Sequence, residues 1–400
     1  MSAPTIKGWC PGAHRPMMSG DGLVVRVRPP LGEMTPRQAR GLADLAAAHG
    51  HGVVELTNRA NLQLRGVAEA DHPALIQGLA ALDLLDADSA AERRRNIVTD
   101  PFRPLGVDDV QTRCAAALTR GLASRDLAPL PSKFGFVVDA GPERRLAGIS
   151  GDVRIEAAGA HLLVRADGRA TGRMVANAAA AVRLALELAR WFLASGGVGP
   201  DGRGRMRRHL AAGATLPPEL SGDTHPQADR PAPRPGPIGT GIGLAAAFGL
   251  IRAQSLHRLA DSGARVLRIT PFRMVFLPDV QDLSVHDPSV HDLPPMIGAS
   301  DLIFDGDDPR LRVIACSGAP ACPQASVATR DLALKLAARL PEKGQLHISG
   351  CAKGCAHPAR SELTLVGRAG AFDLVRDGAP WDEPLRRGAS PHQILTLFGG

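Results

Sequence analysis

The chain has 400 residues, which is too many for one ordinary hydrophobic core, so roughly two to four compact units are expected. Hydrophobic residues make up 44% and charged residues 22% of the chain, which excludes a disordered protein, and the 3% aromatic content argues against base-stacking nucleic-acid surfaces. The net charge of +7 comes almost entirely from arginine, which suits a polyanionic ligand, although a GC-rich coding sequence would explain the same bias.

No apolar run is long enough to span a bilayer, and the first ten residues lack the apolar core of a secretory signal. Six cysteines in 400 residues are too few for a disulfide scaffold. We therefore expect a cytoplasmic protein with reduced thiols that binds neither a membrane nor nucleic acid.

Helix and strand signals alternate through the first half of the chain. Residues 35–48 predict an amphipathic helix that is opened by the cap Thr35 and by Pro36. Extended segments are expected at residues 53–57 and 61–67. A further helix should begin near Val110 and lead into an extended segment that ends at Asp139.

The second half repeats this order after a proline-rich stretch at residues 216–240, which is expected to be a linker or a long surface loop. A helix is predicted over residues 250–261, with strands at 266–270 and 273–280. Residues 55–67 align without a gap with residues 268–280, and a second helix-then-strand unit spans residues 325–349. Both similarities occur in the same order, which favours an internal duplication with a ligand cleft between the halves.

Four cysteines carry the chemistry. Cys316 and Cys322 are separated by five residues, and Cys351 and Cys355 by three. Both pairs lie in stretches rich in glycine and proline, where tight loops can direct backbone N–H groups at a bound group. Thiolates are the ligands of iron–sulfur clusters, and four of them complete one cluster. The sequence therefore predicts an iron–sulfur site and a redox enzyme.

Other uses of these cysteines fit less well. A structural zinc site normally has pairs of cysteines two residues apart, and neither pair has that spacing. The reducing compartment disfavours disulfides. Four thiolates also fit a two-iron cluster, so the number of irons stays open. The isolated Cys114 is expected to be a small core residue, and Cys10 has no assigned role.

The cysteine spacing resembles that of the siroheme-dependent sulfite and nitrite reductase family, and other segments support this likeness. LTNRANLQLRGV at residues 56–67 is similar to the family segment whose arginine and glutamine bind tetrapyrrole carboxylates, here Arg59 and Gln63. VVRVRPPLGEMT at residues 24–35 resembles the segment that places an arginine over the macrocycle. Arg26 and Arg28 lie on one face of that strand, so either could serve. Arg273 lies near the corresponding place of the second repeat and is a candidate carboxylate contact.

The active-site resemblance includes one departure. ERRRNIV at residues 92–98 and PSKFGFVV at residues 131–138 are similar to segments that supply catalytic cations, here Arg95 and Lys133, with Arg28 as a third. The reductases carry a second lysine where this chain has Gly135. Loss of that ammonium should weaken a site that reduces and protonates a small oxyanion.

The segments at residues 7–30 and 239–280 resemble an oxygen-dependent branch of the family that acts in aerobic cobalamin synthesis. The resemblance implies a [4Fe–4S] cluster, a mononuclear non-haem iron whose ligands the sequence does not name, and a metal-free tetrapyrrole substrate, precorrin-3A. O2 and an external electron donor, NADH acting through a reductase, would complete the reaction. The alternative is a siroheme-dependent sulfite or nitrite reductase, in which siroheme is a fixed cofactor.

The resemblance also implies an α+β fold of two pseudo-repeated halves. Each half would be a ferredoxin-like half-domain followed by a nitrite/sulfite reductase-type α+β domain. The expected boundaries are residues 1–75 and 76–215 for the first half, a linker at 216–240, and residues 241–300 and 301–400 for the second, with the cluster in the last domain. The glycines of residues 239–243 do not follow a predicted strand, so a dinucleotide-binding fold is rejected.

Overall fold

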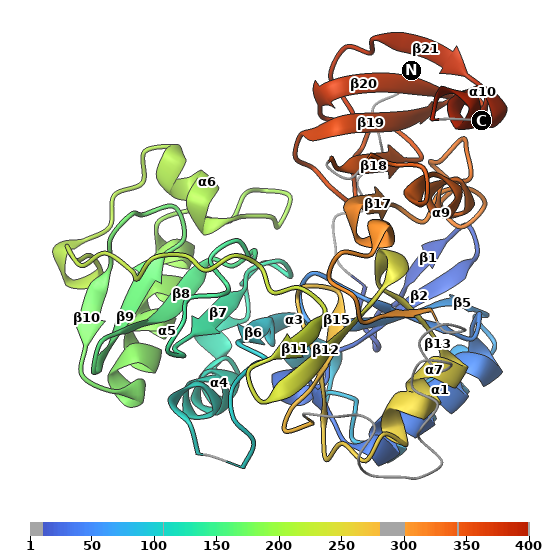
Figure 1. The fold of residues 1–400 in the computed structure, drawn as a ribbon. Coiled ribbons are helices and arrows are strands. Elements are labelled where there is room, and N and C mark those ends of the chain that lie inside the picture. The colour runs from blue at the N-terminus through green and yellow to red at the C-terminus, as the bar shows by residue number, and fades with distance from the viewer. Residues whose placement is uncertain (1–10, 107, 281–300, 342–343, 399–400) are drawn as a thin grey trace.

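The computed structural model describes residues 11–106, 108–280, 301–341 and 344–398. Its α+β fold consists of two sheets packed around a pair of helices, with one further α+β domain attached on each side (Figure 1). Cys10 and part of the predicted second ferredoxin-like half, residues 281–300, lie outside the described residues.

The first sheet uses strands from both halves of the chain. Its order is β1-β2-β5-β4-β13. Helix α1 begins after Thr35, whose hydroxyl accepts from the Gln38 N–H while the Gln38 side chain accepts from Thr35 N–H, so the predicted cap is confirmed. The elements are β1 Met17–Ser19, β2 Gly22–Val27, β5 Leu62–Val67, β4 Val53–Leu56, β13 Leu250–Arg252 and α1 Pro36–His49.

The second sheet has the same order, β11-β12-β15-β14-β3, with β16 also paired to β12. The prediction of a helix over residues 250–261 was wrong at its start, because residues 250–252 form β13, and α7 begins only at Ala253. The edge strand β13 thus joins the first sheet, and β3 of the first half joins the second. The elements are β11 Gly236–Ile238, β12 Gly241–Ala246, β15 Met274–Leu277, β14 Leu267–Ile269, β3 Glu33–Met34, β16 Leu302–Ile303 and α7 Ala253–Ala260.

The two halves share backbone details as well as strand order. Thr57 and Thr270 are matched in the alignment, and each hydroxyl accepts two backbone N–H groups from the following turn. The turns then place Ala60 and Arg273 at φ 53° and 58°. Such agreement in an unusual conformation is the structural mark of the expected duplication.

Each half continues into an α+β domain with one shared topology. In the first domain β6 and β7 are parallel, β7 and β8 are parallel, and β9 and β10 follow antiparallel; β17 to β21 repeat that pattern. The first domain comprises β6 Ile97–Thr99, α4 Val110–Gly121, β7 Phe136–Asp139, β8 Val153–Ala158, β9 His161–Ala166, β10 Arg173–Val175, α5 Ala178–Ala194 and α6 Met206–Ala211. The second comprises β17 Val313–Ala315, α9 Arg330–Ala337, β18 Leu346–Ser349, β19 Ser361–Arg368, β20 Ala371–Gly378, β21 Arg386–Ala389 and α10 Pro391–Leu397.

Helix α9 begins five residues later than expected, because residues 325 and 326 belong to the loop before it. The N–H groups of Ala325 and Ser326 donate to the carbonyls of Cys322 and Gly350, which fixes that loop around the cysteines. The short helices α2 His72–Ala81 and α3 Ser89–Arg94 connect the first sheet to the first α+β domain.

The proline-rich residues 216–240 run along the first α+β domain (Figure 1). Isolated bridges join Gly172 to Thr224 and Arg144 to Asp229, and the segment ends in strand β11. None of the helices within the described residues is long and apolar enough to cross a membrane.

Candidate functional site

The four predicted cysteine ligands gather at one edge of the second α+β domain. Cys316 directly follows β17, and Cys351 lies two residues after β18; because these strands are parallel neighbours, their carboxyl ends meet. The Cys316 N–H donates to the Ile348 carbonyl over 3.2 Å, and the Gly350 N–H donates to Cys316 Sγ over 3.1 Å. A backbone N–H aimed at a cysteine sulfur is the environment that a thiolate ligand requires.

The loops around the other two cysteines are equally tight. The Cys322 N–H donates to the Gly318 carbonyl over 2.7 Å, and Gly318 and Gly354 have φ values of 65° and 63°, which glycine adopts without strain. Partial desolvation raises the pKa of Cys351 and of Cys355, although Cys355 lies at the surface, and the neighbouring cysteines raise both further. The charges of these two thiolates would be stabilised by a cationic iron ligand.

A row of polar side chains crosses the first sheet on the face opposite its apolar, helix-covered side. Arg26, Gln63 and Glu55 are direct cross-strand neighbours on β2, β5 and β4. Arg26 donates to Gln63 Oε1 over 3.2 and 2.5 Å, and Gln63 Nε2 donates to Glu55 Oε2 over 2.9 Å. We call these three residues the polar row.

Two arginines from distant parts of the chain extend the polar row toward the cysteine-bearing domain. Arg330 on α9 donates to Glu55 Oε1, yet its Nε is buried without a partner in the described residues. Burial lowers the pKa of Arg273, with Glu55 opposing this shift and Arg330 adding to it. Both cations are half-buried, and the unpartnered Nε of Arg330 fits a ligand that carries carboxylates.

A histidine that the sequence did not single out lies beside Arg273. His347 on β18 is fully buried, and neither ring nitrogen has a hydrogen-bond partner among the described residues. Its ring centre is 5.6 Å from that of His357, which follows the last cysteine by two residues. Burial lowers the pKa of His347 to about 4, so the imidazole is neutral. Within the described residues, no group of three or more histidine, cysteine or acidic side chains, the four cysteines included, is arranged to hold a single metal ion.

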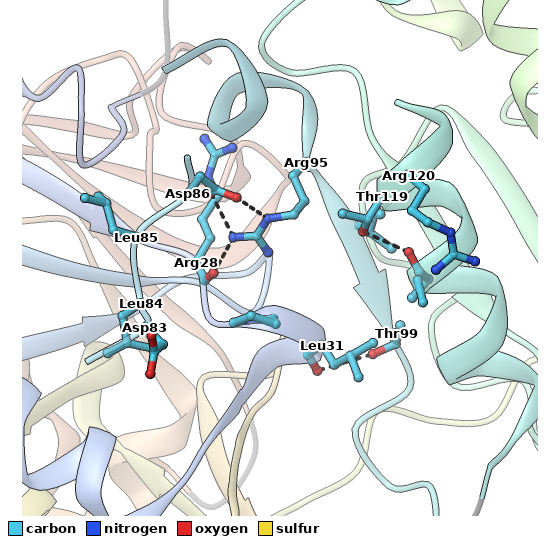
Figure 2. Close-up of a pocket in the computed structure, with 14 residues that line it drawn as sticks. Arg28, Leu31, Asp83, Leu84, Leu85, Asp86, Arg95, Thr99, Thr119 and Arg120 are labelled. Atoms are coloured by element: carbon cyan, nitrogen blue, oxygen red, sulfur yellow. Dashed lines mark hydrogen bonds and ion pairs between the residues drawn. The ribbon is translucent and has the colours of Figure 1, made fainter. Parts of the chain in front are cut away.

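Arg28 and Arg95 line a cavity of about 460 Å³ between the first sheet and the first α+β domain (Figure 2). Arg95 donates to both Asp86 oxygens over 2.6 and 2.8 Å and to the Arg28 carbonyl over 2.6 Å. Arg28 is 4% exposed and donates to the Glu92 carbonyl, while its Nε has no partner among the described residues. Burial and the nearby Arg26 lower the pKa of Arg28 to about 10.

Arg59 and Lys133 meet at the edge of this region. Arg59 donates to the Lys133 carbonyl over 3.3 Å, and the Lys133 side chain is exposed. Gly135, Arg59 and Asn96 line a small adjoining pocket. A Cβ on Gly135 would come within 3.3 Å of the Asn96 carbonyl, so a side chain at the position of the missing lysine would be crowded.

The structure thus places the predicted cationic residues in three adjacent groups. Arg26 joins the polar row through the uncharged Gln63 and Arg273 lies near its Glu55, Arg28 and Arg95 line the cavity, and Arg59 meets Lys133. Sequence reasoning missed Glu55, Arg330 and His347. Alternation along residues 53–57 could have placed Glu55 on the polar face, whereas the approach of Arg330 depends on tertiary packing.

One minor prediction is settled by the same geometry. Cys114 is fully buried in the core of the first α+β domain, as expected, and burial raises its pKa to about 11. His257 of α7 pairs with Asp44 of α1 over 2.9 Å.

Comparison with known proteins defines the class. Residues 15–82 match the nitrite/sulfite reductase ferredoxin-like half domain. The solved structure of the Mycobacterium tuberculosis NirA protein superposes with a TM-score of 0.68 at 16% identity, covering 94% of this chain and 79% of that one. A ferredoxin–nitrite reductase of Synechococcus elongatus is 23% identical, over 88% of this chain and 77% of its own. The fold is that of the nitrite and sulfite reductases, and the chain is an oxidoreductase of this class.

Within the class, one relative is more similar. A precorrin-3B synthase of Sinorhizobium sp is 32% identical over 93% of this chain and 83% of its own length. The chain belongs to the precorrin-3B synthase family.

Proposed function

We propose that the protein is a monooxygenase that converts precorrin-3A to precorrin-3B in aerobic cobalamin synthesis. The substrate is hydroxylated at C20, and a ring acetate closes a γ-lactone at C1. One atom of O2 enters the product and the other leaves as water, with two electrons from an external donor, NADH acting through a reductase. The observation that carries the proposal is the polar row with the half-buried Arg273 and Arg330, which lies against the domain that carries the four cysteines.

In this proposal Cys316, Cys322, Cys351 and Cys355 would hold a [4Fe–4S] cluster, whose chemistry would be electron transfer. Two features support this assignment: the meeting of the parallel strand ends and the N–H to sulfur hydrogen bond. The reduced thiols that the cluster needs also favour a cytoplasmic location.

Arg26, Gln63, Arg59 and Arg273 would bind the carboxylates of the tetrapyrrole. Bidentate arginine–carboxylate pairs both hold and orient such a ligand, which is what a position-selective hydroxylation demands. The unpartnered Nε of Arg330 and the half-buried Arg273 support a carboxylate-bearing occupant beside the polar row.

Arg28, Arg95 and Lys133 would serve the reacting part of the macrocycle. Arg28 is held by the Glu92 carbonyl and Arg95 by Asp86, so the two cations have fixed positions that can stabilise negative charge developing on oxygen. Gly135 leaves this region with one ammonium instead of two, which fits oxygenation better than reduction of a small oxyanion.

The described residues fit a mononuclear iron, which the family implies, less well than they fit the iron–sulfur cluster. His347 and His357 are neighbouring imidazoles, but no third ligand joins them there. No step of the proposed reaction is therefore assigned to such an iron.

Anaerobic purification tests the proposal. The expected result is a broad iron–sulfur absorption without siroheme, followed by turnover of precorrin-3A only after O2 is admitted. Extractable siroheme with a strong Soret band, together with reduction of nitrite or sulfite, would replace the proposed function by that of a siroheme-dependent reductase.

A further inference from the structure

Glu55 places a carboxylate inside the cluster of arginines. Its side chain is 15% exposed and accepts from Arg330, whose side chain is 21% exposed, and from Gln63. Arg26 is one residue further along the row and donates to Gln63 instead. A carboxylate at this position is unfavourable for a surface that binds a polycarboxylate, because like charges repel.

The arginines nevertheless need negative charge in the ligand-free protein. Arg273 is half-buried; the charge of Glu55 stabilises its guanidinium, and the charge of Arg330 destabilises it. Each guanidinium has about five N–H donors, whereas one carboxylate accepts about four hydrogen bonds. Glu55 therefore relieves the repulsion between the arginines, but it cannot accept from all of their N–H donors. The Nε of Arg330 is a donor that has no acceptor among the described residues.

We propose that Glu55 is a built-in counter-carboxylate, which occupies the place of a ligand carboxylate at Arg330 and yields it when the tetrapyrrole binds. The inference rests on the proposed function, because it takes a polycarboxylate tetrapyrrole as the ligand. Glu55 then weakens the binding of polycarboxylates in general and favours a ligand whose own carboxylate reaches both Arg330 and Arg273.

A purely structural role for the same contact has a different consequence. Glu55 lies on β4 and Arg330 on α9, so their ion pair also joins the first sheet to the cysteine-bearing domain. If joining these parts were its whole function, loss of the charge would lower stability and leave ligand affinity unchanged or reduced.

Titration with uroporphyrin I, an octacarboxylate porphyrin, separates these roles. The probe is added to the full-length protein with its cluster, at constant ionic strength, and binding is followed by porphyrin fluorescence. Glu55→Gln keeps the shape of the side chain and removes its charge. We expect the variant to bind uroporphyrin about five- to tenfold more tightly than the wild type, and Arg330→Gln to bind it more weakly.

Asp261→Asn is the matched control. It also removes one negative charge from an ion pair with arginine, but Asp261 and Arg40 are 60% and 46% exposed at the end of α7, on the helix-covered side. Its affinity should equal that of the wild type. Equal or weaker binding by Glu55→Gln would overturn the inference alone. Failure of uroporphyrin to bind the wild type and Glu55→Gln would overturn the proposed function as well.

Discussion

The equivalent faces of the two repeats have opposite properties. In the first sheet the row is Arg26, Gln63 and Glu55, and Glu55 accepts from Arg330 of the cysteine-bearing domain, whose Nε has no partner among the described residues. In the second sheet the strand pairing places Gly243, Phe276 and Arg268 at the corresponding positions. One face is polar and partly accessible, and the other is closed.

The difference comes from the loop that lies against each face. The loop after β6 supplies Phe102, whose ring meets Phe276 edge-on at 4.9 Å, and the carbonyls of residues 101 and 103 that accept from Arg268. The corresponding loop after β17 carries Cys316 and small residues instead. The two loops begin with the same backbone hydrogen bond: the Asp100 N–H donates to the Val138 carbonyl, and the Cys316 N–H donates to the Ile348 carbonyl, both over 3.2 Å. The same fold therefore yields a packed interface in one half and a candidate ligand site in the other.

The largest effect is expected in the cysteine-bearing domain, which lies against the open face of the first sheet. Cys355→Ser should abolish most of the visible absorption and lower the iron content of anaerobically purified protein, because a cluster with one ligand missing is released. Cys114→Ala is the control and should keep both. Unchanged iron and colour in Cys355→Ser would remove Cys355 from the ligand set.

Substitution at two matched positions tests whether one face is structural and the other functional. Phe276→Ala should lower the free energy of unfolding by about 3–5 kcal/mol, since it empties a buried aromatic contact. Gln63→Ala at the equivalent position should cost only about 1 kcal/mol and weaken uroporphyrin binding. Urea unfolding and the porphyrin titration measure both quantities, and equal losses of stability would refute the distinction.

The ends of β7 and β18 differ in charge, and this difference should make the free energy of unfolding depend on pH. Asp139 occupies the place of Ser349, and burial raises its pKa from 3.8 to about 6. The folded protein holds this proton more tightly than the unfolded chain, so the contribution of Asp139 becomes less favourable as pH rises through that range. The free energy of unfolding of Asp139→Asn minus that of the wild type should therefore increase by about 2 kcal/mol as the pH is raised from about 4 to about 7. A pH-independent difference would contradict this.

The smallest effect concerns the turn that both repeats share. Thr57→Val and Thr270→Val each remove a hydroxyl that accepts two backbone N–H groups. Thr270 is fully buried and Thr57 is half-buried, so water can replace only the latter hydroxyl. We expect a loss of about 2 kcal/mol for Thr270→Val and less than about 1 kcal/mol for Thr57→Val. Thermal unfolding compares them, and the reverse order would contradict the burial argument.

Much of the fold could be predicted because its signals are local. The Thr35 cap, the alternation of residues 53–67 and the repeat in residues 268–280 each depend on neighbours in the chain. The helix start at residue 250 was mispredicted because those three residues are taken into the first sheet by pairing with β4. Tertiary contact overrode the local preference there.

In the candidate site, too, the features that depend on local sequence could be predicted, and those that depend on tertiary packing could not. Residue type and spacing were enough to propose the cysteine set and the carboxylate-binding arginines. They could not show that Arg330 reaches Glu55 across 275 residues of sequence, or that His347 is buried beside Arg273. Such contacts arise only when separate elements pack together.

The reciprocal exchange of β3 and β13 has a consequence for the history and handling of the chain. Neither sheet is complete within one half, so a polypeptide ending in the proline-rich segment would lack an edge strand and leave the edge of β4 open. A single ancestral copy could have satisfied both edges by pairing with a second copy of itself, each lending a strand to the other. Fusion of two such copies would then have freed one of the two identical interfaces to diverge. The closed face of one repeat and the open face of the other are an asymmetry that an identical pair of chains could not have.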